Sequence, residues 1–352
     1  MDNDNSRRMA LKFFITACVL SAIYYFIAEN FRKPIQVDGG SRVIMGTFAR
    51  VVAVAKHNSQ AKRCIEAGFK ELNRIDAMMS DYKADSELSK VNREAFARPV
   101  KVSPELFEIL HISVEFSRLS NGAFDITIGP LVDLWHKAGE ANSMPDENTL
   151  AATKARVGYE KLILDANEQT VKFAVDGMRL DLGGIAKGYA VDKAVWAMHK
   201  RGALGGMVDS GGNIRCFGRP ANRPDWLIGI QDPNLADSSV SLPLMVLKLN
   251  PDKFGMSVAT SGDYNRFVTV AGKKISHIID PNTATGAGKL SSDTIITQAA
   301  VDADALSTIV NILGPDKGHE LIESLPDSEC IMITPPPEYR IIKSAGADDY
   351  LH

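Results

Sequence analysis

Helical and strand patterns alternate irregularly from residue 31 to the end of this 352-residue chain, and the region contains neither a low-complexity stretch nor a clear repeat. Such mixing predicts an α/β or mixed α+β body. The length suits either one large domain or two domains of about 150 residues each, so a sizeable core can form without disulfide bonds.

The clearest elements follow from apolar spacing and stop signals. The valines on either side of Gly46 and Thr47 are a strand signal, which predicts β structure over 42–55. A helix from about residue 59 to 80 carries the stripe Ile65, Phe69, Leu72, Ile75, Met79. A second helix starts after Ser103-Pro104 and stops at Asn121-Gly122. Strands are also predicted over 177–182, 227–230 and 275–279. One further helix is predicted to follow Gly183-Gly184 and end at about residue 201, and another to span 299–313. The chain is predicted to end in a loose polar tail beyond the prolines at 335–337.

Composition excludes several classes of protein. The net charge of -3 and a charged fraction of 24% are ordinary for a globular chain and indicate neither a nucleic-acid binder nor a disordered one. The four cysteines contain no C-x-x-C pair, which excludes a zinc knuckle or a thiolate metal site. Cys64 lies in a helical pattern and is predicted to be a small core residue.

Residues 1–30 are predicted to be a membrane anchor or signal segment. Arg7, Arg8 and Lys12 precede the uncharged run 13–28, which reaches the length of a membrane span if Lys12 extends to the interface. Positive residues before the run predict a cytoplasmic N-terminus and place residues 31–352 beyond the membrane. A cleaved signal peptide is the alternative, although no clear A-x-A site follows the run. Lipidation at Cys18 is a weaker alternative, since the residues around it match a lipoprotein signal only loosely.

A glycine-rich turn joins a predicted strand to a helix at Asp181-Leu182-Gly183-Gly184-Ile185-Ala186-Lys187. Its glycines permit close backbone approach, the helix start offers free N–H groups, and Lys187 adds a cation, so a diphosphate would be well bound. The spacing matches neither of the two common nucleotide-binding loops. A tight turn with a surface lysine is the structural alternative.

Two acids and a hydroxyl mark the helix predicted over 299–313. Asp304 and Thr308 are four residues apart and share one helical face within an otherwise apolar stretch. A few hard oxygen ligands suit Mg²⁺, with water or phosphate completing the coordination. Alternatively, Asp302 and Asp304 only cap the start of the helix.

Two further motifs carry candidate residues. His277 ends a predicted strand before the turn Asp280-Pro281-Asn282, where it could act as a general base, contact a phosphate, or serve a structural role. In the segment 122–130, Phe124 could stack on a ring system or belong to the core.

Taken together and in order, the motifs M-G-T, S-x-Y-x-x-x-S-E-L-S, G-A-F-D-I-T-x-G-P, D-L-G-G-I-A-K-G-Y-A-V-D, S-G-G-N-I, A-T-S-G-D, H-I-I-D-P and A-D-A-L-S-T resemble the ApbE family, the FAD:protein FMN transferases. The resemblance covers about residues 40–332. It implies a mixed α/β fold with a central FAD cleft over 31–352. It also implies an Mg²⁺-dependent enzyme that transfers FMN from FAD to a threonine hydroxyl of an acceptor flavoprotein as a phosphoester and releases AMP.

The resemblance also assigns roles to residues. It implies FAD contacts for Met45, Tyr82, Ala123, Phe124, Asp125, Asp181, Lys187 and Ile279. It implies metal ligands at the Gly184 carbonyl, Asp304 and Thr308, while Ser307 stands where some relatives have a second acid. The catalytic candidates are His277, Asp304 and Lys187, with His277 as the proposed base.

The family's members are exported or membrane-anchored, which implies a catalytic domain on the periplasmic side of a bacterial inner membrane. Its acceptors point to a subunit of a membrane electron-transfer complex. Two other functions use the same residues. One is an Mg²⁺-dependent FAD pyrophosphatase, in which water replaces the threonine, and the other is a flavin-binding protein without turnover.

Overall fold

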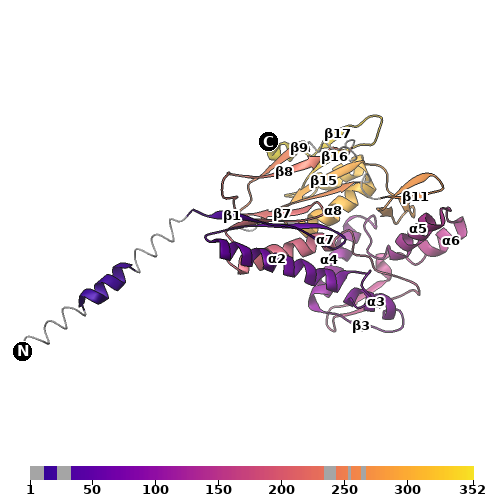
Figure 1. Cartoon of the computed structure of the whole chain (residues 1–352). Helices are drawn as coiled ribbons and strands as arrows, with labels where there is room; N and C mark the ends of the chain where they lie inside the picture. Colours follow the sequence, from indigo (N-terminus) through magenta and orange to yellow (C-terminus); the bar gives the residue numbers. More distant parts are fainter. Residues whose placement is uncertain (1–11, 22–32, 234–242, 253–254, 263–266) are drawn as a thin grey trace, which may run out of the picture.

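The computed structural model describes residues 12–21, 33–233, 243–252, 255–262 and 267–352. Within these ranges the largest sheet has eight strands, in the order β1-β2-β6-β7-β10-β15-β16-β17 (Figure 1). Every neighbouring pair in it is antiparallel. The strands are β1 (Ile35–Ile44), β2 (Thr47–Ala55), β6 (Gly205–Ser210), β7 (Asn213–Phe217), β10 (Met256–Gly262), β15 (Ser292–Thr297), β16 (Glu329–Ile333) and β17 (Ile341–Lys343).

Both faces of the sheet are covered. Three helices pack on one face, namely α2 (Asn58–Met79), α7 (Ala186–Lys200) and α8 (Ala300–Leu313). The hairpin β8 (Trp226–Gln231) and β9 (Pro243–Leu249) covers the other face, above the sheet in Figure 1. Strand β2 shows why its sequence is apolar at nearly every position: Val51 packs toward the helices, whereas Val52 packs toward the hairpin.

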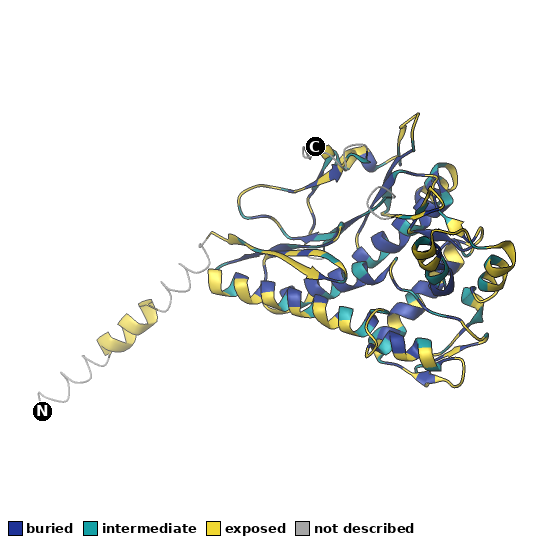
Figure 2. Cartoon of the chain, turned by 45° about the vertical axis from the view of Figure 1, so that its right-hand side comes forward, coloured by how far each residue is buried: buried dark blue, intermediate teal, exposed yellow. Residues whose placement is uncertain are grey.

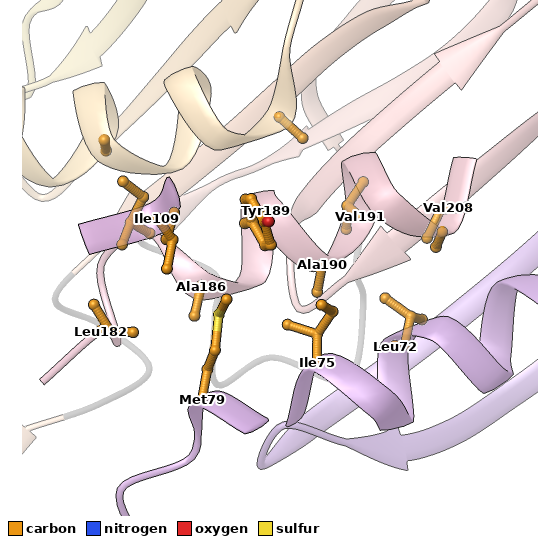
Figure 3. Packing of buried hydrophobic residues seen from close by; sticks show 14 of the residues in the cluster. Leu72, Ile75, Met79, Ile109, Leu182, Ala186, Tyr189, Ala190, Val191 and Val208 are labelled. Carbon is orange, nitrogen blue, oxygen red and sulfur yellow. The ribbon is translucent and has the colours of Figure 1, made fainter. Parts of the chain in front are cut away.

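The predicted helices are confirmed where the apolar stripe is strong. Figure 3 shows Leu72, Ile75 and Met79 of α2 directed at α7, whose Ala186 and Ala190 leave room for them. The second helix, α4 (Pro104–Leu119), begins as predicted, because the Ser103 hydroxyl accepts a hydrogen bond from the Leu106 N–H at 3.3 Å.

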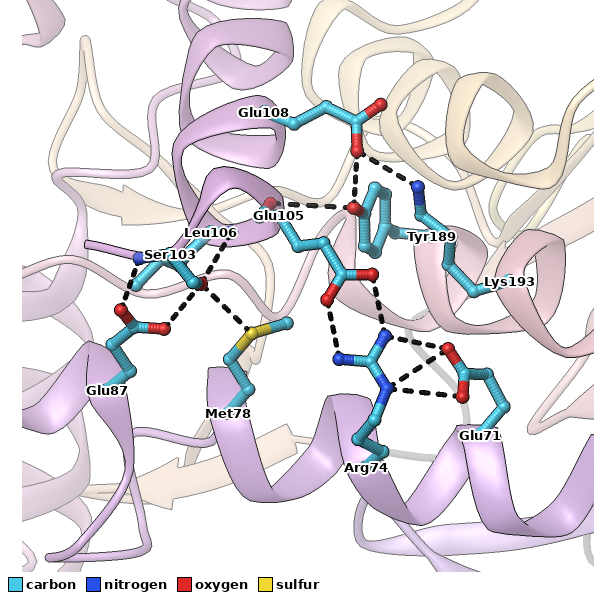
Figure 4. Close-up of polar contacts among 10 residues, drawn as sticks. All are labelled: Glu71, Arg74, Met78, Glu87, Ser103, Glu105, Leu106, Glu108, Tyr189 and Lys193. Carbon is cyan, nitrogen blue, oxygen red and sulfur yellow. Dashed lines mark hydrogen bonds and ion pairs between the residues drawn. The ribbon is translucent and has the colours of Figure 1, made fainter. Parts of the chain in front are cut away.

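Polar contacts tie α4 to α2 and α7 at the surface (Figure 4). Arg74 of α2 donates to Glu105 of α4 at 2.6 Å, and the Tyr189 hydroxyl of α7 donates to Glu108 of α4 at 2.6 Å. The outer faces of the helices remain exposed, whereas the central strands of the sheet, such as β15 and β16, are almost entirely buried (Figure 2). Helices α2, α4 and α7 thus share one apolar core, and polar contacts and ion pairs join them at the surface.

Smaller elements surround one end of the sheet. A three-stranded sheet, β3-β5-β4, lies with the helix α3, and a helical pair, α5 and α6, packs near the hairpin β11-β12. Trp135 of α5 donates its indole N–H to the Ala284 carbonyl at 2.8 Å, which fixes α5 beside β13 and β14. The bounds are α3 (Glu87–Glu94), β3 (Val100–Lys101), α5 (Gly129–Ala141), α6 (Glu147–Lys154), β4 (Leu162–Asp165), β5 (Thr170–Phe173), β11 (Phe267–Val270), β12 (Lys273–Ser276), β13 (Ile279–Asp280) and β14 (Thr285–Gly286).

Several predicted elements differ in detail. The strand signal over 42–55 spans a hairpin turn: its first residues end β1, the chain reverses at Met45-Gly46, where both residues have positive φ, and β2 follows. The strand predicted over 177–182 is wrong: the segment carries only an isolated bridge between Arg179 and Ile128. The strand predicted over 275–279 is interrupted, since β12 ends at Ser276 and β13 begins at Ile279.

The C-terminal region is more ordered than predicted. Helix α8 is followed by another helix, α9 (Pro315–Glu323), so it is not the last. The loose tail is also wrong, because β17 and the short 3₁₀ helix Ala347–Tyr350 follow the prolines, and Ala347 is fully buried against the hairpin side of the sheet.

Most of the predicted N-terminal segment lies outside the described residues. Residues 12–21 are helical with exposed side chains, while 1–11 and 22–32 are not described. Among the described ranges, no helix combines the length and the apolar character that a membrane crossing requires. The prediction for Cys64 is confirmed, since its side chain is fully buried, as are those of Cys216 and Cys330.

Candidate active site

A cavity of about 1270 Å³ lies at the end of the sheet where the β1–β2 turn, the β6–β7 turn and the last residues of β10 come together. Helix α8, the start of α7 and the segments 123–128 and 276–281 complete its walls. The volume exceeds the ~300–1,000 Å³ of a typical small-molecule site, which suits an extended ligand. Every candidate residue lines this one cavity: Met45, Tyr82, Ala123, Phe124, Asp125, Asp181, Gly184, Lys187, His277, Ile279, Asp304 and Thr308.

The glycine-rich turn at the start of α7 forms part of the wall. The Asp181 carboxylate accepts a hydrogen bond from the Gly183 N–H at 2.7 Å, and Lys187 donates to the Gly183 carbonyl at 2.8 Å. A Cβ at Gly184 would lie 3.0 Å from the Thr308 hydroxyl oxygen and 3.2 Å from the Phe124 ring, so a side chain there would crowd the site. No side chain caps this end of α7, which leaves its positive dipole end directed at the cavity.

Three oxygens that could bind a metal line the cavity beside that turn, namely the Gly184 carbonyl, the Thr308 hydroxyl and the Asp304 carboxylate. The Thr308 hydroxyl oxygen lies 3.5 Å from the Gly184 carbonyl oxygen and 3.3 Å from the Asp304 carbonyl oxygen. Asp304 is 3% exposed, and one of its carboxylate oxygens accepts from the Gly188 N–H at 2.9 Å. Its other carboxylate oxygen lies 3.6 Å from the Lys187 ammonium nitrogen. The prediction that Asp304 and Thr308 share one face is therefore confirmed.

This donor set fits a hard divalent cation. A carboxylate, a hydroxyl and a main-chain carbonyl are the oxygen ligands that Mg²⁺ takes when water and phosphate complete its octahedron. In the described part of the chain, no three His, Cys, Asp or Glu side chains gather in a way that could hold a metal by themselves. Ser307 faces the sheet instead and exchanges a hydrogen bond with the Ser261 hydroxyl at 2.8 Å.

The alternative in which Asp302 and Asp304 merely cap α8 is wrong. The N-cap residue, Ala299, provides no side-chain hydrogen bond, and the first two N–H groups of the helix donate to Asp192 of α7. Burial, together with the nearby Asp192 carboxylate, raises the pKa of Asp302, which does not line the cavity.

The segment 123–128 is held by its own polar groups. The Asp125 carboxylate accepts from the Thr127 N–H and from the Tyr159 N–H, both at 2.8 Å, and burial raises its pKa. Phe124 is almost fully buried and packs edge-on against Phe116, with ring centroids 6.3 Å apart. Phe124 is thus a core residue, as one interpretation of the sequence expected, and it also lines the cavity; its stacking on a ring system stays a prediction.

The mouth of the cavity carries exposed groups. Tyr82 is 81% exposed, and Met45 occupies the left-handed turn between β1 and β2. His277 is exposed at the bend that separates β12 from β13, and this interruption of the predicted strand brings it to the cavity. Ile279, two residues later, is buried.

Sequence reasoning missed part of the lining. Asp81 lies between Ser80 and Tyr82, and burial together with the Asp181 carboxylate raises its pKa, although Arg179 pairs with it. Its place in the S-x-Y motif was the available signal. Asn213 and Thr260 belong to the S-G-G-N-I and A-T-S-G-D motifs, which had been assigned no role. Trp135, His136 and Phe267 also line the cavity and carried no signal in the sequence.

Comparison with known proteins gives a consistent result. The ApbE family model matches residues 45–332. The FAD:protein FMN transferases of Treponema pallidum and Haemophilus influenzae are 32% and 34% identical to this chain, over 88% and 74% of it and 87% and 74% of their own lengths.

Two solved structures are similar throughout. The ApbE protein of Thermotoga maritima superposes with a TM-score of 0.79 at 28% identity and covers 91% of this chain and 100% of its own. The flavin transferase ApbE of Vibrio cholerae gives a TM-score of 0.77 at 27% identity, over 90% of this chain and 100% of its own. The mixed α+β fold expected from the sequence is therefore the fold of these structures.

Proposed function

The chain belongs to the ApbE family and is an FAD:protein FMN transferase, and we propose that its cavity binds FAD with Mg²⁺ and passes FMN to a threonine hydroxyl of an acceptor flavoprotein. One observation carries the proposal. The Thr308 hydroxyl lies beside the Gly184 carbonyl and the Asp304 carboxylate lies beside Lys187, and all four residues line the cavity at the uncapped start of α7. Such an arrangement suits a diphosphate bound together with a hard cation.

The reaction is a phosphoryl transfer, in which positioning and charge neutralisation dominate. The threonine oxygen forms a bond to the FMN phosphorus, and the bond from that phosphorus to the bridging oxygen breaks. AMP therefore leaves with the bridging oxygen. A bound Mg²⁺ supplies charge neutralisation on the diphosphate.

The chain's own groups have separate tasks in this scheme. Lys187 and the N–H groups at the start of α7 bind the diphosphate. His277, exposed at the cavity, accepts the proton of the attacking hydroxyl. Met45, Tyr82, Ala123, Phe124, Asp125, Asp181 and Ile279 line the volume in which the rest of FAD is held.

The proposal includes a location and a partner. The basic residues before the apolar run 13–28 support an anchor in a bacterial inner membrane with the catalytic domain on the periplasmic side. A subunit of a membrane electron-transfer complex on that side would then be the acceptor.

A matched pair of variants tests the metal site. Asp304→Asn should lower Mg²⁺-dependent AMP release by about a hundredfold or more, because several kcal/mol of charge stabilisation depend on the bound ion. Asp302→Asn is the control, since Asp302 lies two residues away on the same helix but outside the cavity. If Asp304→Asn and Asp302→Asn respond alike to Mg²⁺, the assignment of the metal site is wrong.

A further inference from the structure

Helix α8, which carries Asp304 and Thr308, and helix α7, which follows the turn at Gly184, run in opposite directions where they meet, and two hydrogen-bonded contacts join them. In the first contact, the Gly188 N–H of α7 donates to the Asp304 carboxylate of α8 at 2.9 Å. In the second, the Asp192 carboxylate of α7 accepts from the N–H groups at the start of α8. Each contact lies four residues from the other along both helices, which is about one helical turn, or ~6 Å.

Asp192 caps the N-terminus of α8, for which the sequence of α8 itself provides no capping side chain. Its two carboxylate oxygens accept from the Ala300 N–H at 2.9 Å and from the Val301 N–H at 3.0 Å. Ala299, at the N-cap position, has no side chain that can accept these bonds. The cap of α8 is therefore supplied by a different helix, so capping also fixes where α8 lies along α7.

A third element joins this contact. Arg215 of β7 forms an ion pair with Asp192, and both side chains are only 16% exposed. Strand β7 begins at Asn213, which lines the cavity. Asp192 thus connects three elements that border the site. They are α7, which follows Gly184 and contains Lys187, α8, which contains Asp304 and Thr308, and β7. None of the atoms of Asp192 itself lines the cavity.

We propose that Asp192 is a positioning residue for the metal site: by capping α8 from α7, it sets the axial position at which Asp304 and Thr308 face the Gly184 carbonyl. The inference rests on the Mg²⁺ site of the proposed function. Gly184 lies in the turn that leads directly into α7, whereas Asp304 and Thr308 lie on α8, so a slide of α8 along α7 moves two of the three oxygens relative to the third. If Gly188 and Asp304 formed the only hydrogen-bonded contact, α8 could still rotate about that point relative to α7. The second contact, between Asp192 and the start of α8, lies one helical turn away and prevents this rotation.

The test separates positioning from simple helix capping. The probe is Mn²⁺, whose binding to the full chain saturated with FAD is followed by EPR, while the affinity for FAD without metal is measured by flavin fluorescence and stability by Tm. Asp192→Asn should weaken Mn²⁺ binding by about tenfold or more, as loss of outer-shell support does at other metal sites. Metal-free FAD affinity should stay within about twofold, because no atom of Asp192 lines the cavity.

A second substitution supplies the discriminating result. Ala299→Ser in the Asp192→Asn background restores a local cap to α8 and should recover Tm without recovering Mn²⁺ affinity. Asp146→Ala is the matched control, because Asp146 caps α6 through the Thr149 N–H at 2.9 Å, in a helix that does not line the cavity. It should lower Tm and leave Mn²⁺ affinity unchanged.

Three results would overturn the inference. One is an Asp192→Asn protein that binds Mn²⁺ as the wild type does, and another is a double variant in which Ala299→Ser restores Mn²⁺ affinity along with Tm. If Asp192→Asn does not fold, Asp192→Glu replaces it. That variant keeps the charge, adds one methylene to the link and should still weaken Mn²⁺ binding, so unchanged binding would be the third refuting result. A wild-type chain that binds no Mn²⁺ would refute the metal site of the proposed function itself, before any variant is compared.

Discussion

Gly188 is the point at which α7 and α8 approach most closely beside the site, and Gly188→Ala tests that approach. A Cβ there would lie 2.1 Å from the Ala300 carbonyl oxygen and 2.8 Å from the Asp304 Cβ. Ordinary contacts of this kind begin near 3.4 Å, so the helices must separate by roughly 1 Å. Overpacking of this kind costs about 1–3 kcal/mol. The gain in helix propensity from glycine to alanine offsets about 1 kcal/mol of that cost.

Gly68→Ala is the matched control, because Gly68 also lies within a buried helix of the same layer. Its new Cβ would meet only side-chain atoms, at 3.1 Å from Val51 and 3.4 Å from Met198, and these can adjust. The propensity gain is the same, so the free energy of unfolding should be about 1–3 kcal/mol lower for Gly188→Ala than for Gly68→Ala. Urea unfolding of both proteins measures this difference.

Gly188→Ala should also impair function, since the Gly188 N–H holds one Asp304 oxygen. We expect the Mg²⁺ concentration for half-maximal AMP release to rise about tenfold, and that for Gly68→Ala to stay at the wild-type value. If both variants unfold at the same urea concentration and respond equally to Mg²⁺, the close contact of α7 with α8 does not support the site.

Three further predictions use other parts of the structure. His277→Ala should retain FAD binding, measured by flavin fluorescence, and lose about 10²–10⁴-fold in transfer rate; an unchanged rate would remove His277 as the base. Burial opposes ionisation of Glu108, but the Tyr189 hydroxyl and the Lys193 ammonium outweigh it and hold the pKa of Glu108 below its usual value of 4.5. Stability from this group is therefore present above pH 4.5 and lost as pH falls through the lowered pKa, so Glu108→Gln should lower Tm at pH 7, and the difference from the wild type should shrink as pH falls below 4.5; a difference that does not change with pH would contradict this. Burial raises the pKa of all three core cysteines, to about 11 for Cys330, so in a Cys18→Ser variant, which removes the exposed thiol, a thiol reagent at pH 8 should label the protein only in urea; rapid labelling of this variant in its native state would refute the burial of the three thiols.

The sequence predicted those elements whose local pattern was strong. Helices α2 and α4 carry long apolar stripes, and α4 also carries a Ser-Pro start. Helix α9 was missed because it is short and has only two buried residues, Gly318 and Ile322. The reversal at Met45 was missed because a methionine rarely takes positive φ, so only Gly46 signalled a turn.

The candidate site was predictable as a set of motifs but not as an arrangement. Every residue predicted to bind FAD or metal or to act in catalysis lines the cavity, although these residues are spread from Met45 to Thr308. The capping of α8 by Asp192 left no local trace, because the partners are 108 residues apart and Ala299 carries no capping side chain. The interruption at His277 was also invisible, since the run from Ile275 to Ile279 is rich in isoleucine and contains neither glycine nor proline to mark a break.

The mass of the acceptor protein tests the central claim most directly. The purified chain is mixed with FAD, Mg²⁺ and a candidate acceptor flavoprotein from a membrane electron-transfer complex, and intact-mass spectrometry is combined with detection of AMP. The account predicts an acceptor gain of one FMN less one water, one AMP released per transfer, and loss of both on addition of a chelator. AMP and free FMN without any gain on the acceptor, or FAD that stays bound and intact, would contradict it.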